Sequence, residues 1–237
     1  MNAAFRSSVL LAILLPIGCS GETPHAVPTV ASESSTLIPA AASECSFGAF
    51  VQETDPAGLN VRSGPSIEAT IIGTLPPGKA VGDLDGFKLM IEVLILGSTN
   101  GWFRVANARD NPELSGQRER SVFNGEGWVS GRKLTVKSQA ATGHASPNAE
   151  SSVALRSRDG SGFDNDTMVR AGQLIACKAD WALVEFSDEA LSDDVRESLI
   201  ISNAARTGSS KRHFRAWLNQ ICSLQETSCD GLATQLE

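Results

Sequence analysis

Residues 58–66 read GLNVRSGPS, and this stretch decides how the rest of the chain is interpreted. Leu59 and Val61 alternate with polar residues, which is typical of a β-strand with one buried and one wet face. Pro65 cannot donate a hydrogen bond to a β-ladder, so the strand should end at the Ser-Gly-Pro turn. The stretch predicts a short strand and a fixed turn, whose polar face either binds a ligand or only meets water.

A fainter copy of this stretch, VALRS, lies at residues 153–157, and other matches follow it in the same order. GWFRV at 101–105 corresponds to DWALV at 180–184, and EGWV at 126–129 corresponds to RAWL at 215–218. These four segments hold all four tryptophans of the chain. The ordered set of matches predicts two copies of one β module.

Short strands separated by turn signals are expected in the first module. They are predicted at Ile67–Thr74, Glu92–Leu96, Trp102–Asn107 and Gly127–Val129. Asn100-Gly101 predicts a two-residue hairpin turn, because both residue types tolerate positive φ. Short strands at this spacing indicate a small barrel or sandwich.

The successive blocks GLNVRSGPS, IIGTLPPGK, GSTNGWFRV and GEGWVSGRKL resemble those of a bacterial SH3-like domain, over about residues 50–136. The second module is a weaker match, because Asp159-Gly160-Ser161 replaces the Gly-Pro turn and no Asn-Gly precedes Trp181. As a whole, the chain resembles tandem SH3-like exported proteins of bacteria. The resemblance implies an all-β fold of two small SH3-like β-barrels in tandem and an association with cell-wall peptidoglycan.

The first 19 residues are expected to be a signal peptide, with an apolar run too short to span a membrane. The run ends in a sequence that resembles a bacterial lipobox, in which Cys19 would be acylated and would anchor the protein to a membrane. The alternative is ordinary cleavage a few residues later, for example after Ala26. Residues 20–44 are rich in Ser, Thr, Ala and Pro, which predicts a disordered tether.

The remaining chain is divided by the repeat into a first SH3-like domain at 45–137, a linker at 138–150 and a second domain at 151–230. Residues 231–237 form a C-terminal tail. The second module carries a long insert at 187–211, within which Ser192 could cap a short helix running through Leu199 to Ala205.

The chain has five cysteines, and removal of Cys19 leaves an even number, as expected of an exported protein. Four cysteines allow three pairings. We predict Cys177–Cys222 and Cys45–Cys229, because Cys177 lies on a predicted strand and Cys222 follows the last strand, positions that a small barrel brings together.

Composition and motifs exclude several classes of function. A net charge of −7 argues against nucleic acid as a partner. No nucleophile, metalloprotease, P-loop or dinucleotide motif is present, so neither an enzyme nor a cofactor is expected. The acidic stretch from Asp159 lacks the Glu of a calcium loop at its twelfth position, which is Arg170, so no metal is predicted. Without any Tyr, the aromatic groove that holds Pro-rich peptides is not expected either.

Four residues are candidates for ligand binding: Asn60, Arg62, Trp102 and Trp128. The alternative is structural, with the tryptophans packed in the core or a hairpin and Arg62 paired with a carboxylate.

The predicted function is a non-enzymatic envelope protein that binds peptidoglycan or another envelope component. It would be a membrane-anchored lipoprotein facing the periplasm, or secreted if Cys19 is not acylated. The alternatives are docking of a periplasmic protein through the inserts, and an accessory role in a cell-wall hydrolase system.

Overall fold

The computed structural model describes residues 42–81, 87–116, 118–225 and 229. The predictions for the signal peptide, for Cys19, for the tether up to residue 41 and for the C-terminal tail therefore lie outside the described residues.

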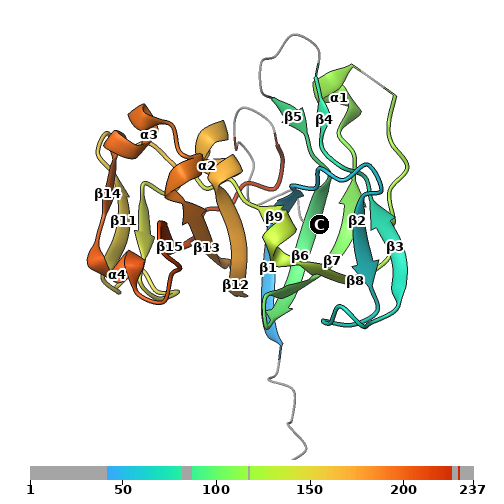
Figure 1. Ribbon diagram of the computed structural model, residues 1–237, viewed down its shortest axis with the longest axis horizontal. Helices are drawn as coiled ribbons and strands as arrows, with labels where there is room; N and C mark the ends of the chain where they lie inside the picture. Colours follow the sequence, from blue (N-terminus) through green and yellow to red (C-terminus); the bar gives the residue numbers. More distant parts are fainter. Residues whose placement is uncertain (1–41, 82–86, 117, 226–228, 230–237) are drawn as a thin grey trace, which may run out of the picture. The chain divides into compact units, whose positions relative to one another are not determined.

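The first sheet has seven antiparallel strands in the order β3-β2-β8-β7-β6-β1-β9 (Figure 1). Its strands are β1 (Ser43–Val51), β2 (Leu59–Arg62), β3 (Ile71–Leu75), β6 (Glu92–Thr99), β7 (Trp102–Arg109), β8 (Gly127–Ser130) and β9 (Leu134–Thr135). A separate ribbon pairs β4 (Lys79–Ala80) with β5 (Lys88–Leu89). Helix α1 (Pro112–Ser115) follows β7, and the 3-10 turn η1 (Gly131–Lys133) joins β8 to β9.

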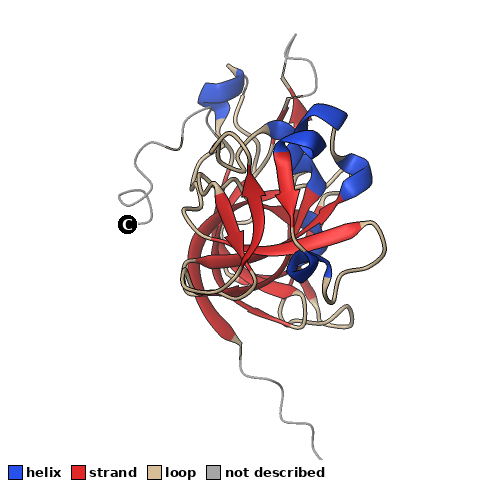
Figure 2. Cartoon of the chain, turned by 90° about the vertical axis from the view of Figure 1, so that its left-hand side faces the viewer, coloured by secondary structure: helices blue, strands red, loops and turns tan. Residues whose placement is uncertain are grey.

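The second sheet has six antiparallel strands in the order β12-β13-β15-β10-β11-β14. Its strands are β10 (Thr142–His144), β11 (Val153–Ser157), β12 (Gly172–Lys178), β13 (Trp181–Ser187), β14 (Leu199–Ile201) and β15 (His213–Leu218). The connections hold α2 (Asp166–Ala171), η2 (Asp188–Ala190), α3 (Asp193–Ser198) and α4 (Asn203–Arg206). Figure 2 shows these helices as short blue segments beside the red strands.

The fold is mostly β with antiparallel sheets, as predicted, but neither sheet closes into a barrel within the described residues. The strands at the two ends of each sheet, β3 and β9 in the first and β12 and β14 in the second, are not paired with each other. One apolar cluster runs through both sheets and includes Phe103 from the first and Leu174 and Phe214 from the second. The two sheets therefore share a core. The sheets meet along edge strand β12, which contacts β1, β6, β7, β9 and η1 of the first sheet's side.

The predicted correspondence between the modules is visible in strand register. Phe103 pairs with Val129 in the first sheet, and the matched residues Ala182 and Leu218 pair in the second. The next pairs along the ladders correspond in the same way. The Asn100-Gly101 turn is confirmed, because both residues have positive φ, at 50° and 76°.

Outside these central hairpins the modules differ from the predicted repeat. Leu75, fourteen residues after Val61, ends strand β3, whereas Val169, fourteen residues after the corresponding Leu155, lies in helix α2. The edge position beyond β11 is filled instead by β14, which comes from the predicted insert. The range 138–150 is more than a linker, because β10 lies within it and joins the second sheet.

Two boundaries also differ from prediction. The predicted helix begins directly after Ser192 but ends at Ser198, because Leu199 turns its side chain into the core and starts β14. Strand β3 begins at Ile71, four residues later than expected. The residues before it form a turn in which the N–H of Ala69 donates to the carbonyl of Ser66.

All four described cysteines form disulfides, as predicted, but the predicted pairing is wrong. The bonds are Cys45–Cys177 and Cys222–Cys229, with Cα–Cα distances of 6.1 and 5.2 Å. The hairpin tip at Ala179 explains the first bond: its N–H donates to the carbonyl of Glu44 and its carbonyl accepts from the N–H of Ser46. Those two hydrogen bonds place Cys45 beside β12. This contact joins residues far apart in the sequence and has no local sequence signal.

Candidate functional site

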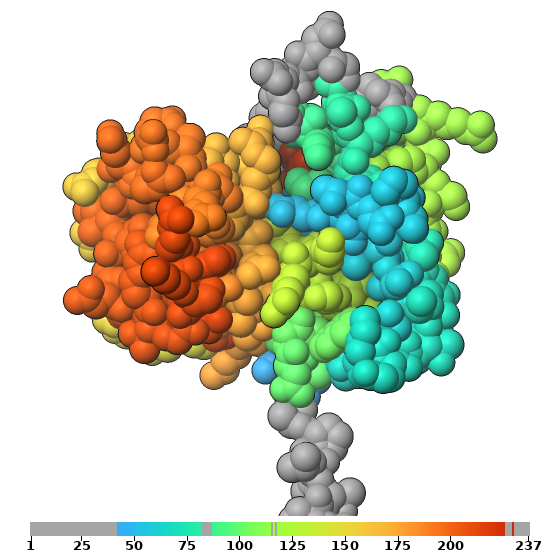
Figure 3. Space-filling model, viewed as in Figure 1, coloured from blue at the N-terminus to red at the C-terminus, as the bar shows by residue number. Residues whose placement is uncertain are grey.

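Three adjoining cavities line helix α2, and we call them together the α2 groove. A cavity of about 240 Å³ shares Met90, Asp166 and Val169 with a second of about 270 Å³. A third, of about 160 Å³, shares Gln52 and Arg170 with the first. In Figure 3 gold atoms of the second sheet's side touch blue atoms of the first on this face of the molecule. The Gln52 side chain, which directly follows β1, donates to the carbonyl of Val169 in α2.

Helix α2 is held in place by its cap and by one of its carbonyl groups. The Asn165 side chain accepts from the N–H of Met168, which satisfies a free donor of the first turn. The carbonyl of Val169 accepts from the Gln52 side-chain amide and, at 2.6 Å, from the hydroxyl of Thr135. The groove wall is thus fixed to β1 and β9 by side chains far away in sequence.

The carboxylate of Glu53, in the groove, is already occupied. It accepts the N–H groups of Thr54 and Asp55, at 2.8 and 3.0 Å, and the ammonium of Lys133, at 3.0 Å. Burial alone would raise the pKa of Glu53. The hydrogen bonds and the Lys133 charge outweigh burial and hold its pKa below the ordinary value. This carboxylate is a structural anion and is not free to bind a ligand.

Gln225 closes another side of the groove in the same structural way. Its side-chain oxygen accepts from the N–H of Met90 at 2.7 Å, and its side-chain amide donates to the carbonyl of Lys88. Its own backbone N–H donates to buried Glu92 at 2.9 Å. These bonds join Gln225 to β5 and β6 and hold its side chain in place.

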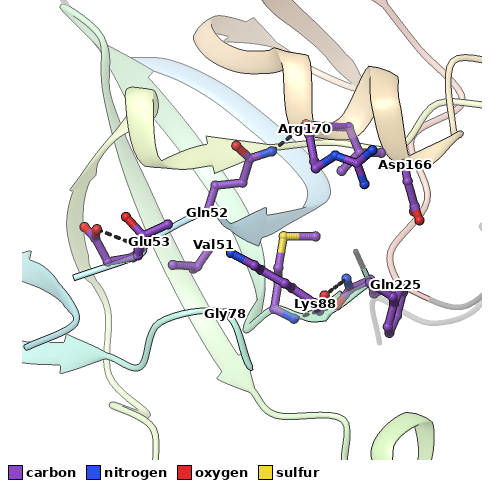
Figure 4. A pocket seen from close by; sticks show the side chains of 12 residues that line it. Val51, Gln52, Glu53, Gly78, Lys88, Asp166, Arg170 and Gln225 are labelled. Carbon is purple, nitrogen blue, oxygen red and sulfur yellow. Dashed lines mark hydrogen bonds between the residues drawn. The ribbon is translucent and has the colours of Figure 1, made fainter. Parts of the chain in front are cut away.

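Four charged side chains of the groove are exposed: Lys88, Arg132, Asp166 and Arg170. Lys88, Asp166 and Arg170 surround the first cavity (Figure 4), and Arg132 and Arg170 line the third. Among the described residues, none of the four forms an ion pair. The apolar lining comes from Val51, Phe87, Met90 and Val169.

The four residues predicted to bind a ligand lie elsewhere, on the outer face of the first sheet. Trp128 on β8 is directly opposite Arg62 on β2 and Arg104 on β7. Directly opposite side chains share a face, with Cβ atoms about 4.5–5.5 Å apart. We call these three residues the arginine–tryptophan row.

The other two candidates extend the same face. Trp102 lies two residues before Arg104 on β7, and Asn60 lies two residues before Arg62 on β2, so alternation places both on the outer side. Arg104 was missed at the sequence level, although its spacing from Trp102 in GWFRV was a usable signal.

The alternative that these residues are only structural is confirmed in part. Both tryptophans are half-buried, neither enclosed in the core nor fully exposed. The Arg62 guanidinium donates to the carbonyl of Ala69 at 2.8 Å and forms no ion pair with the described residues. The turn that follows GLNVR therefore holds Arg62 against the sheet, and Arg104 stays exposed.

The remaining observations concern metal and membrane. Within the described ranges no group of three or more His, Cys, Asp or Glu side chains is placed to hold a metal ion. No helix in that part of the chain has the length and apolar character needed to cross a membrane. Searches against family models, curated proteins and solved structures found no match for the chain.

Proposed function

We propose that this protein is a non-enzymatic, exported envelope protein with two SH3-like modules that binds peptidoglycan or another envelope component through the outer face of the first sheet. The observation that carries the proposal is the arginine–tryptophan row. A chain with a net charge of −7 places one arginine on each side of a half-buried tryptophan, and neither arginine forms an ion pair with the described residues. The nearby carboxylate of Glu68 is exposed, and its pKa is lowered by the Ser66 hydroxyl and, to a smaller extent, by the Arg62 charge.

The chemistry of the row suits a glycan that carries acidic groups. An indole ring offers a flat apolar surface with a polar edge, which can lie against a sugar ring. Guanidinium groups bind carboxylates with two parallel hydrogen bonds. Peptidoglycan combines sugars with carboxylate-bearing peptides, so the indole could bind a sugar ring and the guanidinium groups could bind a carboxylate.

Export and module identity are parts of the same proposal. Two disulfides are typical of proteins that mature outside the reducing cytosol. Matched strand register in the two central hairpins supports a duplicated SH3-like unit. A lipid anchor at Cys19 would tether the protein to the membrane, and mass spectrometry of the mature N-terminus would detect the acyl mass or its absence.

Co-sedimentation with purified peptidoglycan tests the binding. We expect residues 42–237 to sediment with the polymer and Trp128→Ala to weaken retention at least tenfold. Trp217→Ala is the matched control, because Trp217 holds the corresponding position in β15, and it should leave retention unchanged. If the unsubstituted protein stays in the supernatant, or if both substitutions act equally, the outer face of the first sheet is not the wall-binding site.

One observation favours a second candidate, docking of an envelope protein through the insert. Ile200 on edge strand β14 is 44% exposed, and an edge strand with an exposed apolar side chain can pair with another chain. Ile200→Asp should then abolish crosslinking to a partner in intact cells. Deleting the insert is not a clean test, since Leu199 and Ala205 are buried in the core.

A further inference from the structure

The narrow end of the α2 groove has an unbalanced positive charge. Arg132 from η1 and Arg170 from α2 line the same cavity of about 160 Å³. The one carboxylate that lines it, Glu185, accepts from the Arg215 guanidinium at 2.7 Å and from the Gln173 side-chain amide at 2.9 Å. Within the described chain, neither Arg132 nor Arg170 has a carboxylate partner, so this end is suited to a bound anion.

The neighbouring cavity is apolar and large enough for a side chain. Met90 and Val169 are buried, and together with Val51 they line a space of about 240 Å³. For comparison, an engineered apolar cavity of about 150 Å³ holds a benzene molecule. Arg170 and Gln52 border both cavities, so an anion at one end and an apolar group at the other could belong to one small ligand.

The charges around the wide end set the direction of that ligand. Asp166 and Lys88 both border the apolar cavity, so their charges offset each other there, whereas the narrow end has two arginines without a carboxylate partner among the described residues. Arg170 lines both the apolar cavity and the narrow cavity, and Arg132 also lines the narrow one. A ligand carboxylate is therefore favoured beside Arg132 and Arg170. The more distant part of the ligand would extend toward Asp166, which favours a positive group or a hydrogen-bond donor.

We propose that the α2 groove binds the C-terminus of a short peptide that ends in an apolar residue. The terminal carboxylate binds Arg132 and Arg170, the last side chain fills the cavity over Met90 and Val169, and the preceding backbone runs toward Asp166. This site is separate from the arginine–tryptophan row and does not rest on the proposed function.

Isothermal titration calorimetry with the full chain and the tripeptide Gly-Gly-Leu tests the proposal. We expect binding, a loss of at least tenfold when the peptide carries a C-terminal amide, and a loss of about tenfold for each of Arg132→Gln and Arg170→Gln. Arg118→Gln is the matched control, since Arg118 is exposed and lies outside the three cavities, and it should bind as the unsubstituted chain does.

Equal affinity for the acid and the amide would overturn the assignment of the carboxylate site, as would an absence of heat up to millimolar peptide. Octanoate provides a second arm: if it binds as tightly as Gly-Gly-Leu, the site takes acyl carboxylates and the peptide assignment is wrong. Trp128→Ala should leave peptide binding intact, and Arg170→Gln should leave sedimentation with peptidoglycan intact. The two proposals can therefore fail separately.

Discussion

The two sheets place a tryptophan at the same point of the same ladder and surround it with different side chains. In the first sheet Trp128 lies between Arg62 and Arg104. In the second, Trp217 lies between His144 and Leu183. His144 is buried, with its ring edge-on to Trp181 and its Nδ1 beside the carbonyl of Ser151. The two sheets share the register but differ in the neighbours of the tryptophan. The tryptophan therefore belongs to the module, whereas cations directly beside it occur in one copy only.

The disulfides offer the largest expected effect, since one joins the sheets and the other closes a local loop. In the chain-entropy description, a bond closing 132 residues contributes about 5 kcal/mol, and one closing seven contributes about 2 kcal/mol. Replacing Cys45 and Cys177 with Ala should therefore lower the free energy of unfolding more than replacing Cys222 and Cys229. Urea denaturation of the two double variants measures the difference, and equal losses would contradict it.

The shared core predicts that the sheets unfold together. Phe103 and Phe214 are both fully buried, one in each sheet, and belong to the same cluster. Replacing either with Ala should cost about 3–5 kcal/mol and move one common transition. Circular dichroism and tryptophan fluorescence should give coincident curves for both variants. Separate transitions would show that the sheets are independent folding units.

Acid should destabilise the protein more through Glu53 than through Asp159, because Asp159 is exposed and its interactions are screened by solvent. The pKa of Glu53 lies below its ordinary 4.5, so its stabilising contribution is present above pH 4.5 and is lost as the pH falls through the folded value. Glu53→Gln should reduce stability at pH 7 and flatten its decline below pH 4.5. Asp159, whose pKa is lowered to about 2, is an exposed comparison in the second module, and Asp159→Asn should change thermal stability less. Thermal melts of both variants between pH 2 and 7 test this. A larger loss of stability for Asp159→Asn than for Glu53→Gln would contradict the prediction.

The smallest expected effect comes from transferring a cation to the second sheet. Leu183 is half-buried beside Trp217 and corresponds to Arg104. In a chain that carries Trp128→Ala, adding Leu183→Arg should increase retention on peptidoglycan a few-fold over that of Trp128→Ala alone. Leu183→Gln, which adds a polar group without charge, should restore none. Equal results for the two would mean that the cation beside the tryptophan does not contribute.

The features that could be predicted from sequence are those coded locally. Asn100-Gly101 defines its own turn, and matched tryptophans defined the register of two hairpins. What could not be predicted depends on contacts distant in sequence. The disulfide of Cys45 follows from the docking of a hairpin tip that brings Cys177, 132 residues away, beside it. The groove depends on a bond between Gln52 and Val169 that leaves no local pattern. In the second sheet the position beyond β11, which corresponds to that of β3 in the first, is filled by β14 from the insert.

The attachment of Cys45 also has a mechanical consequence. Strand β1 begins at Ser43, and two residues later the chain is covalently bonded to β12. A pull on the chain before Ser43 would otherwise peel β1 from its sheet one hydrogen bond at a time. With the disulfide in place, the load passes through a covalent bond to both sheets at once. A protein held at its N-terminus would then resist extension until its shared core gives way as a unit, and reduction of that one bond would make it yield strand by strand.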